Sequence, residues 1–222
     1  MRVLIIEDEK RLAGNIAQSL RESAGYAVDC AYNGEEGLYL AESNPYDLVV
    51  LDLMLPRTDG LALLNQMRNL GNDTPVLVLT ARDERESVIA LLNAGADDYV
   101  TKPFDLGELI ARGKALIRRG KGRSSATLKA GDLEIDTSTR RVVRKGKAVT
   151  LSAMEYRVLE YLAHRPGAIV YKTELLEHLY DFNWERFSNV IEVYVSGLRR
   201  KLEDKNGELI QTLRGQGYML CS

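Results

Sequence analysis

The sequence predicts an α/β domain built on a doubly wound parallel sheet, followed by a smaller α+β domain. Over the first 120 residues, short apolar segments alternate with longer segments of helical periodicity, which is the pattern of βα units. Brief strand candidates, three helical segments and a hairpin then follow. The length of 222 residues suits two domains that each bury a core.

Five strands are expected in the first part, each followed by a segment long enough for a right-handed crossover helix. The strands are Val3–Ile6, Ala27–Ala31, Leu48–Leu53, Val76–Leu79 and Asp98–Thr101. The helices lie near Leu12–Ser23, Glu35–Ser43, Leu61–Leu70, Glu86–Asn93 and Leu106–Arg118. The third strand is apolar apart from Asp52, so we expect it to be a central strand that is buried on both faces.

The stretch that follows the fifth helix has small and charged residues, two glycines and no apolar period. We therefore expect a first domain over 1–119, a linker over 120–127 and a second domain over 128–222. The second domain should hold strands at Leu133–Ile135, Val142–Arg144 and Ala148–Leu151, and a hairpin from Leu209–Leu213 and Tyr218–Cys221 around Gly215 and Gly217. Ser152, followed three residues later by Glu155, is a capping-box signature for the first helix of this domain.

Composition and charge limit the class of protein. With 45% hydrophobic and 28% charged residues the chain is typical of a soluble protein, and no apolar run approaches the roughly 20 residues that span a bilayer. Residues 1–120 carry 13 Lys+Arg against 19 Asp+Glu, a net −6, whereas residues 121–222 carry 17 against 13, a net +4. This asymmetry favours a cation-binding half joined to a nucleic-acid-binding half.

Neither a leader nor a disulfide framework is indicated. The chain begins at once with a strand-like run and has no long apolar stretch before a cleavage site, so we expect a cytoplasmic protein with no membrane partner. Only Cys30 and Cys221 are present, too far apart in sequence to suggest a disulfide framework or a zinc site. We interpret both as packing residues.

Polar residues stand at the carboxyl ends of four predicted strands, where open parallel sheets bind their ligands. They are Glu7-Asp8, Asp52, Thr80-Ala81 and Lys102-Pro103. Converging carboxylates repel one another unless a cation joins them, and oxygen ligands suit Mg²⁺. Asp52 can then attack a phosphoryl group as a carboxylate nucleophile, while Thr80 and Lys102 hold its oxygens and Ala81 leaves room for it. Each residue alone is more often structural, but the set predicts a phosphoacceptor site.

Four segments resemble the receiver domain of two-component response regulators. They are Glu7-Asp8, LDLMLPRTDG around Asp52, LTAR around Thr80 and GADDYVTKPF around Lys102. The resemblance covers essentially residues 1–120. It implies a flavodoxin-like fold, phosphorylation of Asp52 by a sensor histidine kinase, and a Mg²⁺ site formed by Glu7, Asp8, Asp52 and the main-chain carbonyl of Met54. It also implies phosphate contacts from Thr80 and Lys102 and a cis peptide between Lys102 and Pro103.

The same resemblance implies a switch and a dimer interface. Thr80 is expected to move toward the phosphate and Tyr99 to turn into the space, although Tyr99 also fits an ordinary half-buried strand aromatic. The homodimer formed on phosphorylation should use Ile89, Leu92, Asp97, Asp98, Glu108, Ala111, Arg112 and Arg119. Relatives usually carry a basic residue where this chain has Val88, so Glu108 is expected to lack its usual partner.

A helix over Ser188–Leu202 has a stripe of apolar residues on one face. The stripe is formed by Ile191, Val195, Leu198 and Leu202. The remaining face offers groups that suit phosphates and base edges, and we expect DNA contacts from Asn189, Val193, Ser196, Arg199, Arg200 and Lys201. Alone, this pattern is only an amphipathic helix.

The C-terminal hairpin strengthens the DNA interpretation. Gly215 and Gly217 make a tight turn that projects Arg214 like a wing, with Thr212 and Gly215 as further contacts. The segments LSAMEYRVLEYL, SNVIEVYVSGLRRKL and TLRGQGY resemble the OmpR/PhoB class of winged helix-turn-helix domains. The resemblance implies promoter DNA, with direct repeats as its expected form. Many relatives have arginines at the positions of Asn189 and Gly197, which leaves the base contacts open.

The segment from Asp181 to Phe187 joins the second and third helices of this domain. The segment holds Phe182 and Trp184, and the family uses it to contact RNA polymerase, but Trp184 fits a core-anchoring role equally well. Two other functions remain as alternatives. An aspartate nucleophile with Mg²⁺ also fits a phosphatase, although no second carboxylate motif suits acid catalysis and no P-loop is present. A DNA-binding protein that ignores phosphate is less favoured because the receiver positions are all intact. We therefore interpret the chain as a regulator, not an enzyme.

Overall fold

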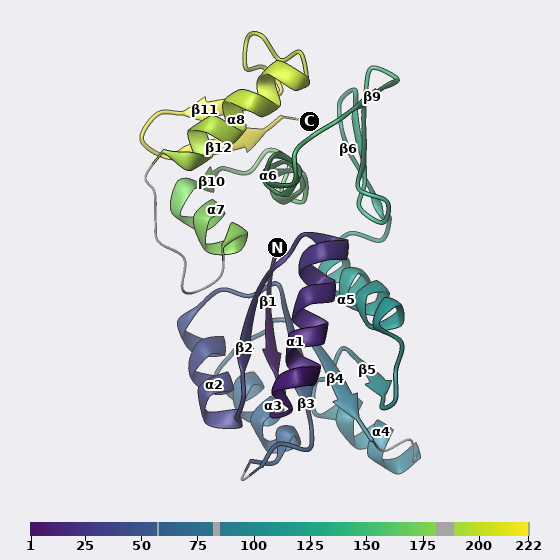
Figure 1. Ribbon diagram of the computed structural model, residues 1–222. Helices are drawn as coiled ribbons and strands as arrows, with labels where there is room; N and C mark the ends of the chain where they lie inside the picture. The colour runs from purple at the N-terminus through teal and green to yellow at the C-terminus, as the bar shows by residue number, and fades with distance from the viewer. Residues whose placement is uncertain (57, 82–84, 181–188, 222) are drawn as a thin grey trace. The chain divides into compact units, whose positions relative to one another are not determined.

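The computed structural model describes residues 1–56, 58–81, 85–180 and 189–221, without the side chains of residues 85–87. The chain divides into two compact units, Met1–Gly120 and Lys121–Ser222, and each is described by itself (Figure 1). Among the described residues, none of the helices has the length and apolar character needed to cross a bilayer.

The first unit is a five-stranded parallel sheet, as the sequence predicts. Its strands are β1 (Arg2–Ile6), β2 (Ala27–Ala31), β3 (Leu48–Asp52), β4 (Val76–Thr80) and β5 (Asp98–Thr101). Their order is β2-β1-β3-β4-β5, so the direction of winding reverses after the first strand pair. This switch point lies between β1 and β3, where a doubly wound sheet presents its ligand site.

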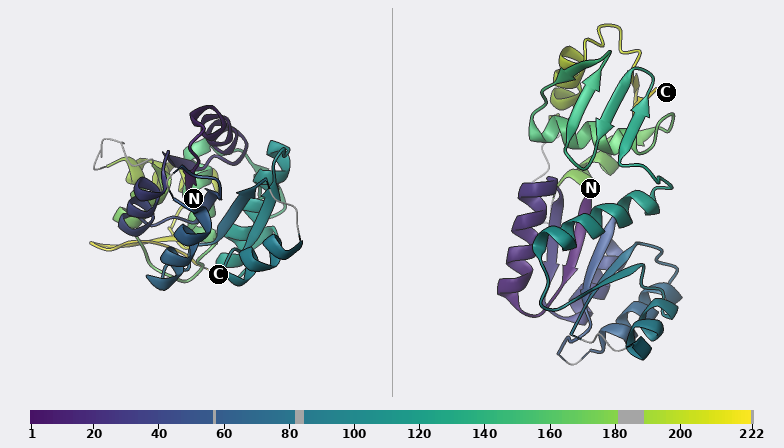
Figure 2. Two further views of the ribbon diagram at one scale, coloured as in Figure 1. Left: turned by 90° about the horizontal axis from the view of Figure 1, so that it is seen from below. Right: turned by 90° about the vertical axis from the view of Figure 1, so that its right-hand side faces the viewer.

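Helices cover both faces of this sheet. They are α1 (Lys10–Ser19), which continues into a π-helical turn at Leu20–Ala24, α2 (Gly34–Ser43), α3 (Gly60–Asn69), α4 (Arg85–Asn93) and α5 (Leu106–Gly120). The right-hand view of Figure 2 shows α1 and α5 on one face of the sheet. The opposite face packs on α2, α3 and α4 through one apolar cluster that includes Leu40, Leu64, Met67 and Leu91. The fold class predicted for this unit is therefore confirmed.

The second unit contains two antiparallel sheets and three helices. The first sheet has the strands β6 (Thr127–Ala130), β7 (Leu133–Asp136), β8 (Arg141–Arg144) and β9 (Lys147–Val149) in sequential order. The helices α6 (Ala153–Ala163), α7 (Lys172–Leu179) and α8 (Val190–Lys201) follow, and β10 (Val170–Tyr171), β12 (Gly217–Leu220) and β11 (Ile210–Leu213) form the second sheet. This arrangement confirms the expected winged helix-turn-helix architecture.

Several boundaries differ from the expectation. Strands β6 and β10 were not predicted, because β6 buries only Leu128 and Ala130 and β10 is two residues long. Strand β9 ends at Val149 and does not reach Leu151. Residues 120 and 127 were expected in the linker, yet α5 includes the former and β6 begins at the latter. Short elements such as these carry too little periodicity to be read from sequence.

The capping box and the buried stripe of the second unit follow the sequence pattern. The Ser152 hydroxyl accepts a hydrogen bond from the Glu155 amide at 3.4 Å, and the Glu155 carboxylate accepts one from the Ser152 amide at 2.6 Å. The four stripe residues of α8 and its C-cap, Ile191, Val195, Leu198 and Leu202, are all at most 1% exposed. These contacts fix α8 against α6 and leave its other face to solvent.

A buried charged network joins β1, β2 and the residues before β3. It lies toward the amino ends of these strands, away from the predicted site at their carboxyl ends. Arg2 is 3% exposed, and its guanidinium donates to Asp29 at 2.7 Å and lies over the ring of Tyr46 at 4.9 Å. The Tyr46 hydroxyl donates to the same Asp29 carboxylate at 3.0 Å, and the Arg2 amide donates to Asp47 at 2.9 Å. Removing one member of such a pair leaves an uncompensated buried charge.

We expect Asp29→Ala to lower the free energy of unfolding of the first unit by about 3–5 kcal/mol, because Arg2 stays buried without its carboxylate. Tyr46→Phe keeps the ion pair and removes one hydrogen bond to a charged group, so its expected cost is about 1.5–3 kcal/mol. Urea denaturation followed by hydrogen exchange in β1 measures both. Equal losses for the two variants would contradict the ion-pair account.

Candidate functional site

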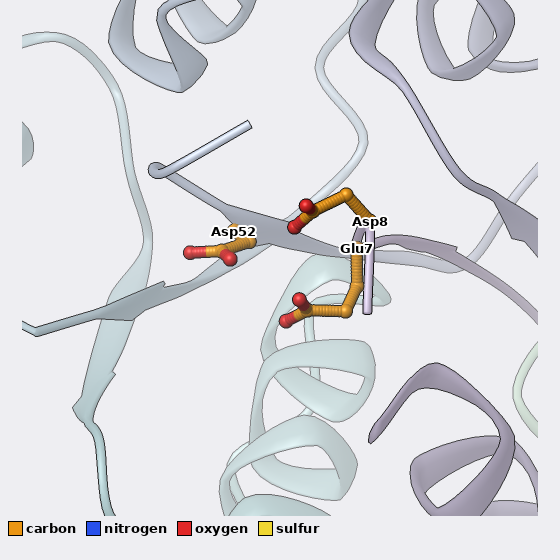
Figure 3. Close-up of side chains that lie close together, drawn as sticks. All are labelled: Glu7, Asp8 and Asp52. Atoms are coloured by element: carbon orange, nitrogen blue, oxygen red, sulfur yellow. The ribbon is translucent and has the colours of Figure 1, made fainter. Parts of the chain in front are cut away.

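Three carboxylates meet at the carboxyl end of the central strands. Asp52 is the last residue of β3, and Glu7 and Asp8 directly follow β1, its neighbour in the sheet. One ligand oxygen from each of the three lies within 4.8 Å of the others, and Figure 3 shows the three side chains gathered at these strand ends. Glu7 and Asp52 are 1% and 2% exposed, whereas Asp8 is exposed to solvent. The parallel topology thus brings together residues that are 45 positions apart.

A lysine joins the two buried carboxylates. Lys102 directly follows β5, and its ammonium group lies 2.8 Å from Glu7 and 2.8 Å from Asp52. Burial raises the pKa of Glu7, with a further contribution from Asp52, and the Lys102 ammonium opposes this rise. Burial alone would lower the pKa of Lys102, but its hydrogen bonds to Asp52 and Glu7 outweigh burial and raise that pKa. The peptide between Lys102 and Pro103 is cis, as expected.

The main chain after β3 is held close to the start of α3. The Gly60 amide donates to the Leu53 carbonyl at 3.1 Å, and Asp59 caps α3 by accepting from the Leu61 amide at 3.0 Å. A Cβ atom on Gly60 would lie 2.6 Å from the Asp52 carbonyl oxygen and 2.6 Å from the Leu53 Cα. Asp52 itself accepts a hydrogen bond from the Met54 amide at 3.1 Å. Gly60 is therefore a positioning residue that the sequence argument missed, and the Asp-Gly pair inside LDLMLPRTDG was its signal.

A cavity lies beside the carboxylates, on the side of β4 and α4. Thr80 ends β4, is 3% exposed, and its carbonyl accepts the Lys102 amide at 2.8 Å. The cavity has a volume of about 280 Å³ and is lined by Leu53, Met54, Asp59, Leu61, Thr80, Val88, Ala90 and Leu91. Tyr99 is half-buried on β5 and packs against the core cluster on this face of the sheet. The Thr80 side chain therefore has open space on one side and the carboxylate cluster nearby.

Comparison with known proteins shows the family to which the chain belongs. The family described as "Response regulator receiver domain" matches residues 3–114, and the family "Transcriptional regulatory protein, C terminal" matches residues 146–220. The transcriptional activator protein IrlR of Burkholderia pseudomallei is 41% identical over 99% of this chain and 96% of its own length. The response regulator MprA of Mycobacterium avium is 42% identical over 99% of this chain and 98% of its own. The chain belongs to the response regulators.

Solved structures agree for the first unit of this response regulator. The receiver domain of the Francisella response regulator 1452 is 41% identical, with a TM-score of 0.52, and the match covers 53% of this chain and 97% of that one. A two-component response regulator from Clostridium difficile is 37% identical with a TM-score of 0.51, covering 54% and 97%. The receiver is joined to a transcriptional regulatory domain, which confirms the OmpR/PhoB-type resemblance and a role in DNA-binding transcription regulation.

The expected DNA contacts of this response regulator fall into two groups. Exposed on α8 or at its start are Asn189, Val193, Ser196 and Arg200. Two other cations on α8 are engaged within the chain: Arg199 donates to the Ile210 carbonyl at 3.0 Å and to the Thr212 hydroxyl at 2.8 Å, and Lys201 donates to Glu155 at 2.6 Å. The sequence pattern could not separate Arg200 from Arg199 and Lys201, because all three are cations at the same end of one helix.

The wing is formed by the β11–β12 hairpin. Arg214 and Gly215 are exposed at its turn, where Gly215 adopts a φ of +73°, a left-handed conformation that favours glycine. The expected polymerase-contact segment, Asp181–Phe187 with Phe182 and Trp184, lies outside the described residues. Within the described residues the structure thus offers a helix face and a hairpin tip from one domain.

The residues expected at the dimer interface are largely exposed but already carry ion pairs. Ile89 and Leu92 on α4 are 49% and 46% exposed, and Ala111 and Arg119 on α5 are exposed as well. The Arg112 guanidinium lies 3.0 Å from Asp98 and 2.8 Å from Glu108. Asp97 pairs with Arg68 at 3.0 Å. Glu108, expected to lack its usual partner on α4 because of Val88, pairs with Arg112 within its own helix.

We expect Gly60→Ala to destabilise the first unit by about 1–3 kcal/mol and to slow modification of Asp52, because the new methyl group displaces the main chain of Asp52 and Leu53. Gly14→Ala, on exposed α1 with no atom within 4 Å of the new Cβ, is the matched control. It should gain about 0.5–1 kcal/mol from helix propensity alone. Calorimetry of both variants tests this, and a Gly60→Ala protein as stable as wild type would contradict it.

Proposed function

We propose that this response regulator accepts a phosphoryl group on Asp52 from a sensor histidine kinase and that the modification controls DNA binding. The observation that carries the proposal is the environment of Asp52. Its carboxylate is 2% exposed, lies beside Glu7 and Asp8, and is 2.8 Å from the Lys102 ammonium. A carboxylate held against a cation at a strand end is poised to act as a nucleophile rather than to contribute stability.

The chemical step is a transfer from an imidazole to a carboxylate. A carboxylate oxygen of Asp52 attacks phosphorus, the P–N bond of the kinase phosphohistidine breaks, and the imidazole leaves with the bonding electrons and takes a proton from water. The product is an acyl phosphate. Lys102 supplies a positive charge and Thr80 a hydroxyl donor to the phosphoryl oxygens, and Ala81 presents no bulky side chain beside Thr80.

The acidic cluster fits a hard divalent cation. Carboxylate and carbonyl oxygens are the ligands that Mg²⁺ prefers, and it commonly uses only one or two protein carboxylates together with waters and phosphate. Glu7, Asp8, Asp52 and the main-chain carbonyl of Met54 would hold it. When bound, Mg²⁺ neutralises charge on the phosphoryl group in the transition state.

The cavity near Thr80 supports a route from phosphate to surface. An acyl phosphate on Asp52 attracts the Thr80 hydroxyl, and Tyr99 then turns inward toward the space that Thr80 vacates. Because Val88, Ala90 and Leu91 line the same cavity, α4 can shift with this change. The result is a new arrangement of the surface formed by α4, β5 and α5.

That surface is the proposed homodimer interface. Ile89, Leu92 and Ala111 supply its apolar centre, and the charged rim consists of Asp97, Asp98, Glu108, Arg112 and Arg119. The charged residues must exchange their internal partners for those of a second copy, which favours a dimer of modest affinity without phosphate. A dimer carries two winged helices, which suits two repeated half-sites in promoter DNA, and we include RNA polymerase among the proposed partners on the family resemblance alone.

The relatives are transcription regulators, and this supports a regulatory rather than enzymatic role. In a phosphatase, a second acid would have to protonate the leaving group of a small phosphoester. Glu7, Asp8 and Asp52 are accounted for by metal and phosphate, so we propose that small phosphoesters are not turned over.

We expect treatment with acetyl phosphate and Mg²⁺ to add the mass of one phosphoryl group to the wild-type protein. Asp52→Asn keeps the shape of the side chain but should remain unmodified, and chelation of Mg²⁺ should abolish the modification of wild type. Intact-protein mass spectrometry measures this directly. Modification of Asp52→Asn to the wild-type extent would disprove the assignment of Asp52.

We expect Leu92→Asp to keep the protein monomeric after phosphodonor treatment, because a charge then lies in the apolar centre of the interface. Leu70→Asp is the matched control, since Leu70 is 58% exposed at the end of α3, away from the proposed interface. Sedimentation velocity with and without phosphodonor distinguishes the two. A monomeric wild type under both conditions, or equal effects of the two variants, would refute the proposed interface.

A further inference from the structure

The hairpin between β8 and β9 carries a group of cations that the proposed helix and wing do not use. Its sequence is Arg144-Lys145-Gly146-Lys147. Lys145 and Gly146 have φ of +50° and +74°, so the chain turns tightly at this point, and both lysines are exposed. The hairpin therefore presents two flexible ammonium groups at a narrow tip, much as the β11–β12 hairpin presents Arg214.

One residue of the hairpin fastens it to the end of α8. The Arg144 guanidinium donates to the main-chain carbonyl of Leu202, the C-cap of α8, and lies 3.2 Å from Asp132. The Lys145 ammonium lies 3.9 Å from the same Asp132, at the limit of an ion pair and with its side chain 62% exposed. Arg144 thus holds the hairpin at the C-terminal end of α8.

An open groove of about 270 Å³ separates the hairpin from α8. Its lining residues are Arg144, Lys145, Lys147, Ala148, Val149, Thr150, Lys201, Leu202 and Glu203. Four of these are cations and one is an acid. Asp132 offsets Arg144 and Glu155 offsets Lys201, so among the described residues Lys145 has only its 3.9 Å contact with the same Asp132, and Glu203 is the one acid among the lining residues. Exposed lysines this weakly paired contribute little to the stability of the fold.

We propose that this groove and its two lysines bind the DNA backbone, as a second phosphate contact beside α8 and the wing. The inference rests on the proposed DNA-binding function. Continuity supports it, because the groove begins at Lys201, directly after the exposed Arg200 of α8, and Figure 1 shows the β8–β9 hairpin on the side of the domain where α8 ends.

The chemistry of the lining selects phosphate over base edges. The groove has no amide side chain and no aromatic ring among its lining residues, and lysine ammonium groups act as point charges that suit phosphate oxygens. The contact is therefore independent of base sequence. The contact lengthens the DNA footprint of the domain beyond the base pairs that α8 and the wing cover. The added base pairs lie on the side of the C-terminal end of α8.

The test compares the full-length variant K145Q/K147Q with K129Q/R141Q, which removes two exposed cations of the same sheet from outside the groove. Glutamine removes the charge and keeps an unbranched polar side chain, and circular dichroism confirms folding. The Kd is measured against salt concentration for a duplex selected by the wild type from random sequences, and for an unselected duplex of equal length.

We expect K145Q/K147Q to weaken binding to both duplexes by about tenfold and to reduce the slope of log Kd against log salt by about 1.8, two phosphate contacts at about 0.9 each. Trimming the duplex on the flank toward which α8 ends should produce the same loss in the wild type and none in the variant. An unchanged slope for K145Q/K147Q, or an equal loss of affinity for K129Q/R141Q, would overturn the inference. It would also be overturned if K145Q/K147Q changed the phosphorylation of Asp52 and left the Kd for DNA unchanged. Failure of the wild type to bind any duplex would instead refute the proposed function itself.

Discussion

The receiver depends on one electrostatic constraint: two carboxylates are buried at the end of a parallel sheet. Glu7 and Asp52 are almost inaccessible, and ionised carboxylates in such a position are costly unless a cation lies beside them. Lys102 provides that charge from β5, two strands beyond β3, so the site exists only when β1, β3, β4 and β5 are in register. Because the carboxylates at this site outnumber the Lys102 ammonium, the site favours ligands that bring more positive charge to Asp8 and Asp52. The same arrangement underlies our proposal that Asp52 is both a metal ligand and a nucleophile.

In the second domain, hydrogen bonds and an ion pair within the chain separate structural cations from those left for a ligand. Arg199 ties α8 to β11, Lys201 ties it to the capping box of α6, and Arg144 ties it to the first sheet. Gly197 is part of this arrangement, because a Cβ there would lie 2.4 Å from a carboxylate oxygen of Glu155. A larger side chain at this position would displace the Glu155 carboxylate and loosen its contact with Lys201.

The sequence could predict the receiver site because its residues stand at strand ends, and the ends of parallel strands meet whatever the details of packing. Glu7, Asp52 and Lys102 come together for that reason. Side-chain hydrogen bonds and ion pairs near the surface could not be predicted in this way. The engagement of Arg199 with Ile210, and of Arg112 with Glu108, depends on side-chain directions that residue type and helical spacing do not determine. The two-residue strand β10 was missed for a related reason, since what defines it is its pairing with β12, of Val170 with Tyr218 and of Tyr171 with Gly217.

The central claim is that phosphate on Asp52 controls DNA binding by the second domain. The most direct measurement is the affinity for a direct-repeat duplex before and after treatment with Mg²⁺ and a small phosphodonor, for the wild type and for Asp52→Ala. Our account predicts that the treatment tightens binding of the wild type and leaves Asp52→Ala unchanged. Equal binding by both proteins under both conditions would leave a DNA-binding protein but would contradict its control by phosphorylation.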